Sequence, residues 1–296
     1  MDSVHALVAE AERADGTPPF SDQAMLAASH GERAIVAFNG SVNDPVVDPR
    51  APLAVGIRGE GELDLAVRPS ARGAGVGREA LAHLLSEVDR EAPAPLLAWA
   101  HGENPAASAL LSGAGFTPVR TLYRLALDPA GLPAALAEAR AMPAGFYTEN
   151  FDPSRPDDAR SWVHVNAAAF ADHPEQGGVT EDDFAALRAE AWFNPEDLIF
   201  ARDESNGSLA GYTWVKTVRE PGETETELYV LGVDPKYVGR GLGAALLGVT
   251  LRRMSDHHPT RITLYVDGSN EHARALYARA GFTVDTVSTQ WLRNNE

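Results

Sequence analysis

The feature of this sequence that most constrains its fold is a long internal repeat. The phrase "VRPSARGAGVG" at residues 67–77 returns as "VDPKYVGRGLG" at residues 233–243, an offset of 166 positions. The same offset relates a set of later residues without a gap, namely Asn104 to Asn270, Leu110 to Leu276, Gly115 to Gly281 and Phe116 to Phe282. A period of this length is too long for a solenoid. We therefore expect two copies of one domain fold in tandem.

Each copy predicts the same order of strands and helices. In the first, strands are expected at 53–57, 62–67, 95–100 and 116–127, and helices at 78–88 and 104–115. In the second, strands are expected at 197–202, 209–218, 225–234, 261–266 and 282–292, and helices at 243–254 and 269–281. This order predicts an α/β (α+β) fold in each copy, a mixed twisted sheet flanked by helices. The Pro-, Ala- and Gly-rich stretch 128–145 predicts the join, with domains at 1–138 and 139–296.

The composition narrows the classes of function. The chain has 296 residues and a formal net charge of −17, so it should repel nucleic acid and anionic membranes. It has no cysteine, which excludes disulfides, thiolate catalysis and Cys-based metal sites, and no metal is expected. Neither a signal peptide nor an apolar run long enough to span a membrane is found. We expect a cytoplasmic protein, and a monomer is compatible with this composition.

The repeated glycine turn is an arrangement suited to anions. In each copy a strand, a glycine-rich turn and a helix start follow one another, and backbone N–H groups at a helix N-terminus lack internal partners. Glycine lets a phosphate approach the backbone without a Cβ clash. The spacing G-x-G-x-G in "GAGVG" and "GRGLG" differs from the dinucleotide fingerprint, and no Gly-Lys-Ser/Thr is present. The alternative is that the glycines only permit a tight turn.

The first turn, "RGAGVG", matches the pattern Arg/Gln-x-x-Gly-x-Gly/Ala, and a helix ending in "GAGF" or "RAGF" follows each turn. Asn104 and Asn270 lead these helices and are expected as their N-caps, which is compatible with contact to a ligand. These motifs resemble the GCN5-related N-acetyltransferases. The resemblance implies two tandem acetyltransferase domains, acetyl-CoA as the cosubstrate with its pyrophosphate on a glycine turn, and a small-molecule amine as the acceptor. The second copy departs from the pattern at Val238, where the family usually has Arg or Gln.

The two copies differ in the residues that could move protons. The resemblance implies a general base and a general acid, for which Glu227 is the candidate base and Tyr265 and Tyr277 are rival candidate acids. Subtracting the offset places Gly61, Trp99 and Leu111 at the corresponding positions. We therefore expect catalysis in the second copy, while the first binds acetyl-CoA idly, supports the fold or lends residues to the substrate site. Glu227 could instead be an exposed strand carboxylate, and either tyrosine a packing residue.

Further stretches, "ADGTPPFSDQ", "VNAAAFADHPEQGG", "GYTWVK" and "ELYVLGVDP", resemble a tandem branch of this family. Its members acetylate the cysteinyl amine of a cysteine–glucosamine–inositol pseudo-disaccharide (Cys-GlcN-Ins). By this resemblance the substrate-binding residues are Asp22, Glu175, Lys216, Glu227 and Tyr265. Asp22 stands where the branch usually has Glu, and it could instead cap a helix.

The resemblance also implies the coenzyme contacts. In the second copy they are Leu231, Gly232, Val233, Val238, Gly239, Arg240, Gly241, Leu242, Gly243, Ala244, Asn270, Glu271, His272, Ala273, Arg274 and Ala275. In the first copy they are Leu65, Ala66, Val67, Gly73, Ala74, Gly75, Val76, Gly77 and Arg78. The implied reaction is direct transfer in a ternary complex. The alternatives are a tandem acetyltransferase for another amine, such as an aminoglycoside or a protein N-terminus, and a coenzyme A-binding regulator without turnover.

Overall fold

The computed structural model describes residues 2–39, 52–91, 95–171 and 176–294. Its contacts divide the chain into two compact units. Unit 1 comprises Met1–Tyr123, Asp267–Ser269 and Thr286–Glu296, and unit 2 comprises Arg124–Val266 and Asn270–Asp285. Each unit therefore holds one repeat together with a short piece that the sequence places in the other. The domain boundary at residues 138 and 139 stays a prediction.

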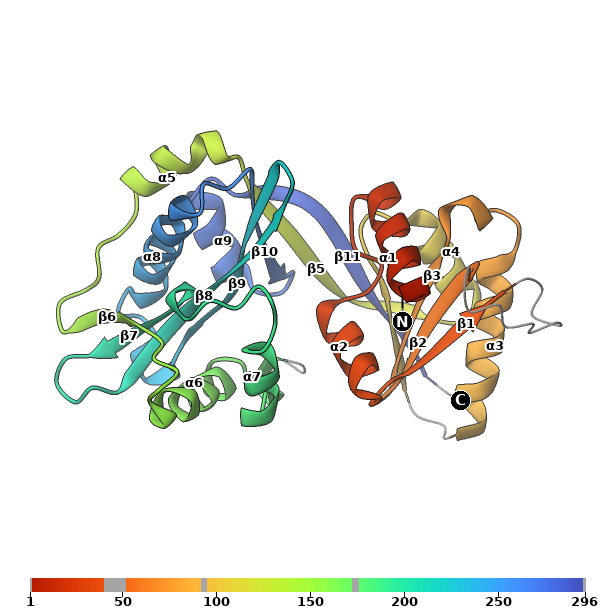
Figure 1. The fold of residues 1–296 in the computed structure, drawn as a ribbon, viewed down its shortest axis with the longest axis horizontal. Helices are drawn as coiled ribbons and strands as arrows, with labels where there is room; N and C mark the ends of the chain where they lie inside the picture. The colour runs from red at the N-terminus through yellow and green to blue at the C-terminus, as the bar shows by residue number, and fades with distance from the viewer. Residues whose placement is uncertain (1, 40–51, 92–94, 172–175, 295–296) are drawn as a thin grey trace. The chain divides into compact units, whose positions relative to one another are not determined.

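Unit 1 is a mixed sheet with helices on both faces (Figure 1). Its elements are α1 (Asp2–Asp15), α2 (Asp22–His30), β1 (Ala34–Phe38), β2 (Ala54–Gly59), β3 (Glu62–Val67), α3 (Val76–Glu91), β4 (Leu96–Ala100) and α4 (Pro105–Gly113). The first part of β5 (Thr117–Leu127) and the last part of β11 (Thr283–Arg293) complete it. Strands β1, β2 and β3 are antiparallel, β3 and β4 are parallel, and β11 runs antiparallel to β4.

Strand alternation builds two cores in unit 1 because successive side chains point to opposite faces. On the α1 and α2 side, Val55, Ile57 and Ala66 pack with helix residues such as Leu7. On the other side, Ala54 and Leu63 pack against α3 through Ala80, Leu81 and Leu84. This second core also contains Trp291, so the end of the chain contributes to the core of the first repeat.

Unit 2 has the same plan with longer strands. It contains α5 (Leu132–Ala137), β6 (Phe146–Asn150), α6 (Pro156–Ala169), α7 (Glu181–Leu187), β7 (Leu198–Asp203), β8 (Leu209–Glu220), β9 (Glu223–Val233), α8 (Leu242–Asp256), β10 (Arg261–Asp267) and α9 (Glu271–Arg279). Strands β6 to β9 are antiparallel neighbours, and β10 runs parallel to β9. Helices α6 and α7 cover one face of this sheet and α8 covers the other (Figure 1).

An aromatic cluster fills the space between the sheet and helices α6 and α7. Trp162 stacks on Phe184 with ring centroids 4.2 Å apart, and Trp214 meets both rings edge-on at 5.7 Å. The buried Tyr212 hydroxyl donates to Asn166 at 2.6 Å. The Asn166 amide in turn donates to the carbonyl of Gln176 at 2.6 Å. Helix α6 is thereby fixed to the sheet and to the segment that begins at Gln176.

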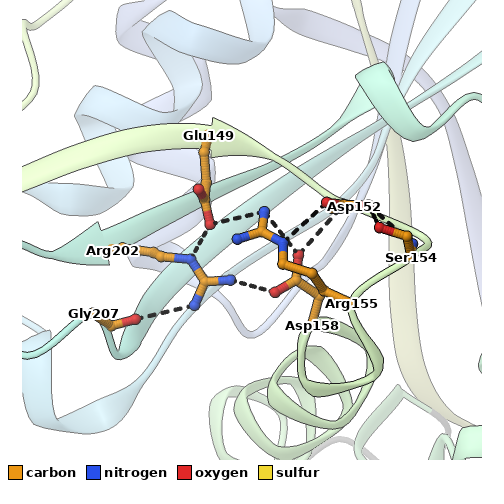
Figure 2. Close-up of polar contacts among 7 residues, drawn as sticks. All are labelled: Glu149, Asp152, Ser154, Arg155, Asp158, Arg202 and Gly207. Atoms are coloured by element: carbon orange, nitrogen blue, oxygen red, sulfur yellow. Dashed lines mark hydrogen bonds and ion pairs between the residues drawn. The ribbon is translucent and has the colours of Figure 1, made fainter.

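Helix α6 is also tied to the sheet edge by a network of charges (Figure 2). The buried Arg202 guanidinium on β7 donates to Glu149, to Asp158 at 2.6 Å and to the Gly207 carbonyl at 3.0 Å. Arg155, which precedes α6, pairs with Glu149 and Asp158 at 3.4 Å. Removing one partner of such a buried pair typically costs about 3–5 kcal/mol, because the remaining charge loses its compensation.

The strands and helices predicted for both repeats are confirmed, with ends that differ by a few residues. The cap predictions are confirmed too: the side chains of Asn104 and Asn270 accept the backbone N–H of Ala107 and Ala273. The segment expected as the join, 128–145, contains α5, which packs against α8 in unit 2.

Candidate active site

The glycine turn of unit 2 leads from β9 into α8. Gly239 and Gly241 both have φ +85°, a left-handed conformation that side chains other than glycine adopt only under strain. Helix α8 starts at Leu242, so the N–H groups of its first turn have no partners inside the helix. A Cβ added at Gly239 or Gly243 would meet no atom within 4 Å, so the backbone is open to a ligand there. The turn therefore fits a phosphate group.

Strands β9 and β10 separate before this turn. Their pairing runs over Arg261–Leu264 and ends at Leu228, whereas β9 continues to Val233. The Asp234 N–H donates to the Ala210 carbonyl of the neighbouring strand at 3.0 Å. Since backbone groups alternate in direction along a strand, the amides of Leu231 and Val233 point toward the separated β10 side. An extended amide chain could pair with them as an added strand.

A β-bulge in the same strand was not anticipated from the sequence. Trp214 pairs with Val230 and Val215 pairs with Leu228, so Tyr229 is an extra residue in β9. Bulges of this kind re-aim side chains and often lie beside active sites. The bulge follows Glu227 by two residues and therefore lies between the candidate base and the glycine turn.

Glu227 and Lys216 are directly opposite each other on β9 and β8. They share the sheet face that carries Trp214, because residues two apart on a strand point the same way. The Lys216 ammonium lies 5.5 Å from the ring centre of Trp192 and 5.8 Å from that of Tyr229. These two rings meet at 5.1 Å. The structure thus places a lysine in an aromatic corner beside Glu227, and Trp192 and Tyr229 are site residues that sequence reasoning missed.

Tyr265 on β10 lies on the same face as Glu227, since Thr263 pairs with Glu227 and points the same way. Burial and, to a smaller extent, the negative charge of Glu227 raise the pKa of the Tyr265 phenol to about 12, while the hydrogen-bonded Arg124 opposes the rise. Arg124 itself is buried on β5 and forms an ion pair with Asp285 at 2.6 Å. The structure therefore brings Glu227 and Tyr265 together, with Arg124 behind the phenol.

Tyr277 has a different environment. It lies on α9, is 8% exposed, and its ring meets Phe282 at 6.0 Å. Burial alone raises the pKa of its phenol to about 12. Both candidate acids therefore keep their proton at neutral pH, but only Tyr265 is coupled to the charge of Glu227.

The remaining predicted contacts are distributed as follows. Asp22 is the first residue of α2 in unit 1, and the cap of that helix is Ser21, whose hydroxyl accepts the Ala24 N–H at 3.1 Å. The alternative reading of Asp22 as the cap is therefore wrong. Glu175 lies outside the described residues. Val238 is 68% exposed at the second glycine turn.

The first glycine turn repeats the geometry of the second. Gly73 and Gly75 have φ of +77° and +89°, and α3 begins at Val76. The arginine of the motif, Arg72, is held by Asp15 through two hydrogen bonds of 2.6 and 2.8 Å. That ion pair with Asp15 raises the pKa of Arg72 and partly neutralises the one side chain that the second turn lacks.

Within the part of the chain that the structure describes, no group of three His, Asp or Glu residues is arranged to hold a metal ion. Over the same residues, none of the helices combines the length and the apolar character needed to cross a membrane.

Comparison with known proteins adds sequence relatives. The model of the acetyltransferase (GNAT) family matches residues 162–282. A mycothiol acetyltransferase of Clavibacter sepedonicus is 40% identical over 296 residues, covering 99% of this chain and 92% of the relative. One of Kineococcus radiotolerans is 41% identical over 294 residues, covering 98% and 92%.

Solved structures of other proteins have a similar fold. A tandem GNAT protein from the clavulanic acid biosynthesis pathway superposes with a TM-score of 0.71 at 18% identity, covering 98% of this chain and 94% of the other. A GCN5-related N-acetyltransferase from Sphaerobacter thermophilus gives 0.64 at 21% identity, covering 98% and 91%. The predicted tandem acetyltransferase fold is confirmed by these likenesses.

Proposed function

The chain belongs to the mycothiol acetyltransferase family, and we propose that it acetylates the cysteinyl amine of Cys-GlcN-Ins with acetyl-CoA, which gives mycothiol. The observation that carries the proposal is the polar group formed by Lys216, Glu227 and Tyr265 on one face of unit 2. It lies on the strands that separate before the glycine turn, where the acetyl donor is expected. We assign the reaction to the cytoplasm.

The coenzyme would be held by the parts of unit 2 that fit it. The open backbone from Gly239 to Ala244 would bind the pyrophosphate, because amide donors and the helix dipole converge there. The amide of Val233 would pair with the pantetheine arm. When bound, acetyl-CoA supplies the acetyl group as a thioester, which an amine can attack without a covalent enzyme intermediate.

Glu227 would accept a proton from the cysteinyl ammonium, directly or through a water, so that the nitrogen can attack. The Leu231 amide would donate to the thioester oxygen as negative charge develops there. Tyr265 or Tyr277 would protonate the departing thiolate. Both phenols, with a pKa near 12, are protonated at neutral pH and can serve as donors.

The acceptor would be recognised by charge and hydrogen bonds. The Glu227 carboxylate would suit a cationic amine and a sugar with several hydroxyls. For Asp22 and Glu175, contact with the substrate stays a prediction from the resemblance. Lys216 would donate to a hydroxyl or to the cysteinyl carbonyl, with its orientation restricted by Trp192 and Tyr229. Because the chain has no cysteine, a thiol substrate cannot form a mixed disulfide with it.

The experiment is thiol release from acetyl-CoA with Cys-GlcN-Ins, followed by mass spectrometry of the product. We expect stoichiometric thiol and a product heavier by one acetyl group on nitrogen. Release with an aminoglycoside or a peptide amine but not with Cys-GlcN-Ins would replace the substrate in this proposal. Binding of acetyl-CoA without release for any amine would indicate a regulator instead.

A further inference from the structure

We propose that Arg124, a residue of the first sequence repeat, is a positioning residue for Tyr265 in the active site of unit 2. The inference rests on the proposed function, because it concerns the phenol that would meet the substrate. It adds a residue that no motif in the sequence marks. Arg124 is 6% exposed and lies on β5, which neighbours β10 in the sheet.

The chemistry of the pair sets the direction of the Tyr265 hydroxyl. A guanidinium has only donors, so the phenol oxygen must accept the hydrogen bond from Arg124. The phenol proton is then free to point away from Arg124, toward the face that carries Glu227. Arg124 thereby fixes Tyr265 as a donor toward the substrate, whether the acceptor is a substrate oxygen or the leaving sulfur.

Arg124 is itself held in place. Asp285 on β11 accepts from it at 2.6 Å and also from Arg261 at 2.9 Å. Because the Asp285 carboxylate binds a second arginine, it does not neutralise Arg124 completely. The remaining positive charge of Arg124 therefore opposes the rise of the Tyr265 pKa.

The internal repeat offers an independent argument. The offset of 166 relates Arg124 to Gln290 and Tyr265 to Trp99. In unit 1, Gln290 on β11 pairs directly with Trp99 on β4. The strand position beside the phenol is thus an arginine in unit 2, and the strand position beside the indole is a neutral amide in unit 1, where a different arginine, Arg120, lies over the Trp99 ring at 5.7 Å. At these paired strand positions, arginine accompanies the residue that carries a hydroxyl.

The test is a double-mutant cycle on the full chain with Arg124→Gln, the residue found in the other copy, and Tyr265→Phe. We expect Arg124→Gln to lower kcat/KM for the amine by about 10–100-fold, the effect typical of losing a hydrogen bond to a charged group. KM for acetyl-CoA should stay within twofold. The double variant should be within twofold of Tyr265→Phe alone, and Arg124→Lys should recover part of the loss. Losses that multiply in the double variant, or Arg124→Gln within twofold of wild type, would overturn the proposal.

Arg261→Gln is the matched control, because Arg261 also binds Asp285. It should stay within twofold of wild type. A second readout needs no turnover: in protein labelled with ¹³Cζ-tyrosine, the Tyr265 resonance, assigned with Tyr265→Phe, should shift in Arg124→Gln and not in Arg261→Gln. An unmoved resonance would refute the contact itself. If the wild-type protein does not acetylate Cys-GlcN-Ins, the proposed function is wrong. The Tyr265 resonance and a double-mutant cycle measured with another amine would still test the role of Arg124.

Discussion

The two units have the same fold, but their central hairpins differ in length at the position of the proposed base. In unit 1, β2 ends at Gly59 and β3 begins at Glu62, and Gly61 in the turn has φ +77°. In unit 2 the equivalent position is Glu227, well inside a hairpin whose strands continue to Glu220 and Glu223. The first hairpin therefore turns where the second still presents side chains. Strand length, and not only residue identity, distinguishes unit 1 from unit 2 at the position of the proposed base.

On the corresponding face of unit 1, charged side chains form ion pairs with one another. The buried Arg33 donates to Asp64 at 2.7 Å and to Glu62 at 2.9 Å, on the side of the sheet covered by α1 and α2. Trp99 stacks with His101 at 5.7 Å, and burial lowers the pKa of His101 against a smaller opposing effect of Asp64. Unit 1 therefore has the glycine turn, but Gly61 and Trp99 stand at the positions equivalent to Glu227 and Tyr265.

The largest effect should come from Glu227→Gln. If Glu227 is the base, kcat should fall by about 10²–10⁴-fold, while KM for acetyl-CoA changes little. Steady-state thiol release at saturating acetyl-CoA measures it. Glu62→Gln is the control in unit 1, since Glu62 is a strand carboxylate that pairs with Arg33 at 2.9 Å. A Glu227→Gln rate within twofold of wild type would remove the asymmetry between the two units.

The next effect concerns the two glycine turns. Gly241→Val and Gly75→Val carry the same steric penalty, because φ is +85° and +89°. Strain of about 1–3 kcal/mol at such a position corresponds to roughly 5–150-fold. We expect Gly241→Val to raise KM for acetyl-CoA by that factor and Gly75→Val to leave kcat/KM within twofold. Equal losses in both variants would show that the first turn is not idle.

Lys216→Met should have a smaller effect, about tenfold on kcat/KM for the amine. The substitution removes the ammonium, and with it the proposed contact to the substrate and the two cation–π interactions with Trp192 and Tyr229. Each cation–π interaction contributes about 0.5–2 kcal/mol in such settings. Arg219→Met is the control: it lies on the same strand, but its guanidinium contacts His257 at 2.8 Å. If both variants lose activity equally, Lys216 acts through the strand and not through the site.

The repeat in the sequence was enough to predict the strand and helix order, the glycine turns and the asparagine caps, because each has a local pattern. Helices α1, α2, α6 and α7 were not assigned, since they lie outside the repeated segment on which the sequence argument relied. The Tyr229 bulge and the aromatic corner around Lys216 depend on strand pairing, which no local pattern specifies. Arg124 was missed for a similar reason: it lies beside Tyr265 because β5 and β10 are adjacent strands in the sheet, which no local pattern specifies.

The smallest predicted effect separates capping from coenzyme contact at the paired asparagines. Asn104 and Asn270 accept a backbone N–H at 2.9 and 3.0 Å, in helices of nine residues each. Replacing either by Ala should lower the free energy of unfolding by about 1 kcal/mol, the usual cost of a lost cap, measured by urea denaturation. If Asn270 also touches the coenzyme, Asn270→Ala raises KM for acetyl-CoA while Asn104→Ala does not. Equal stability losses with unchanged KM in both variants would make the two caps equivalent, and the difference between the units would then begin at the strands rather than at this helix.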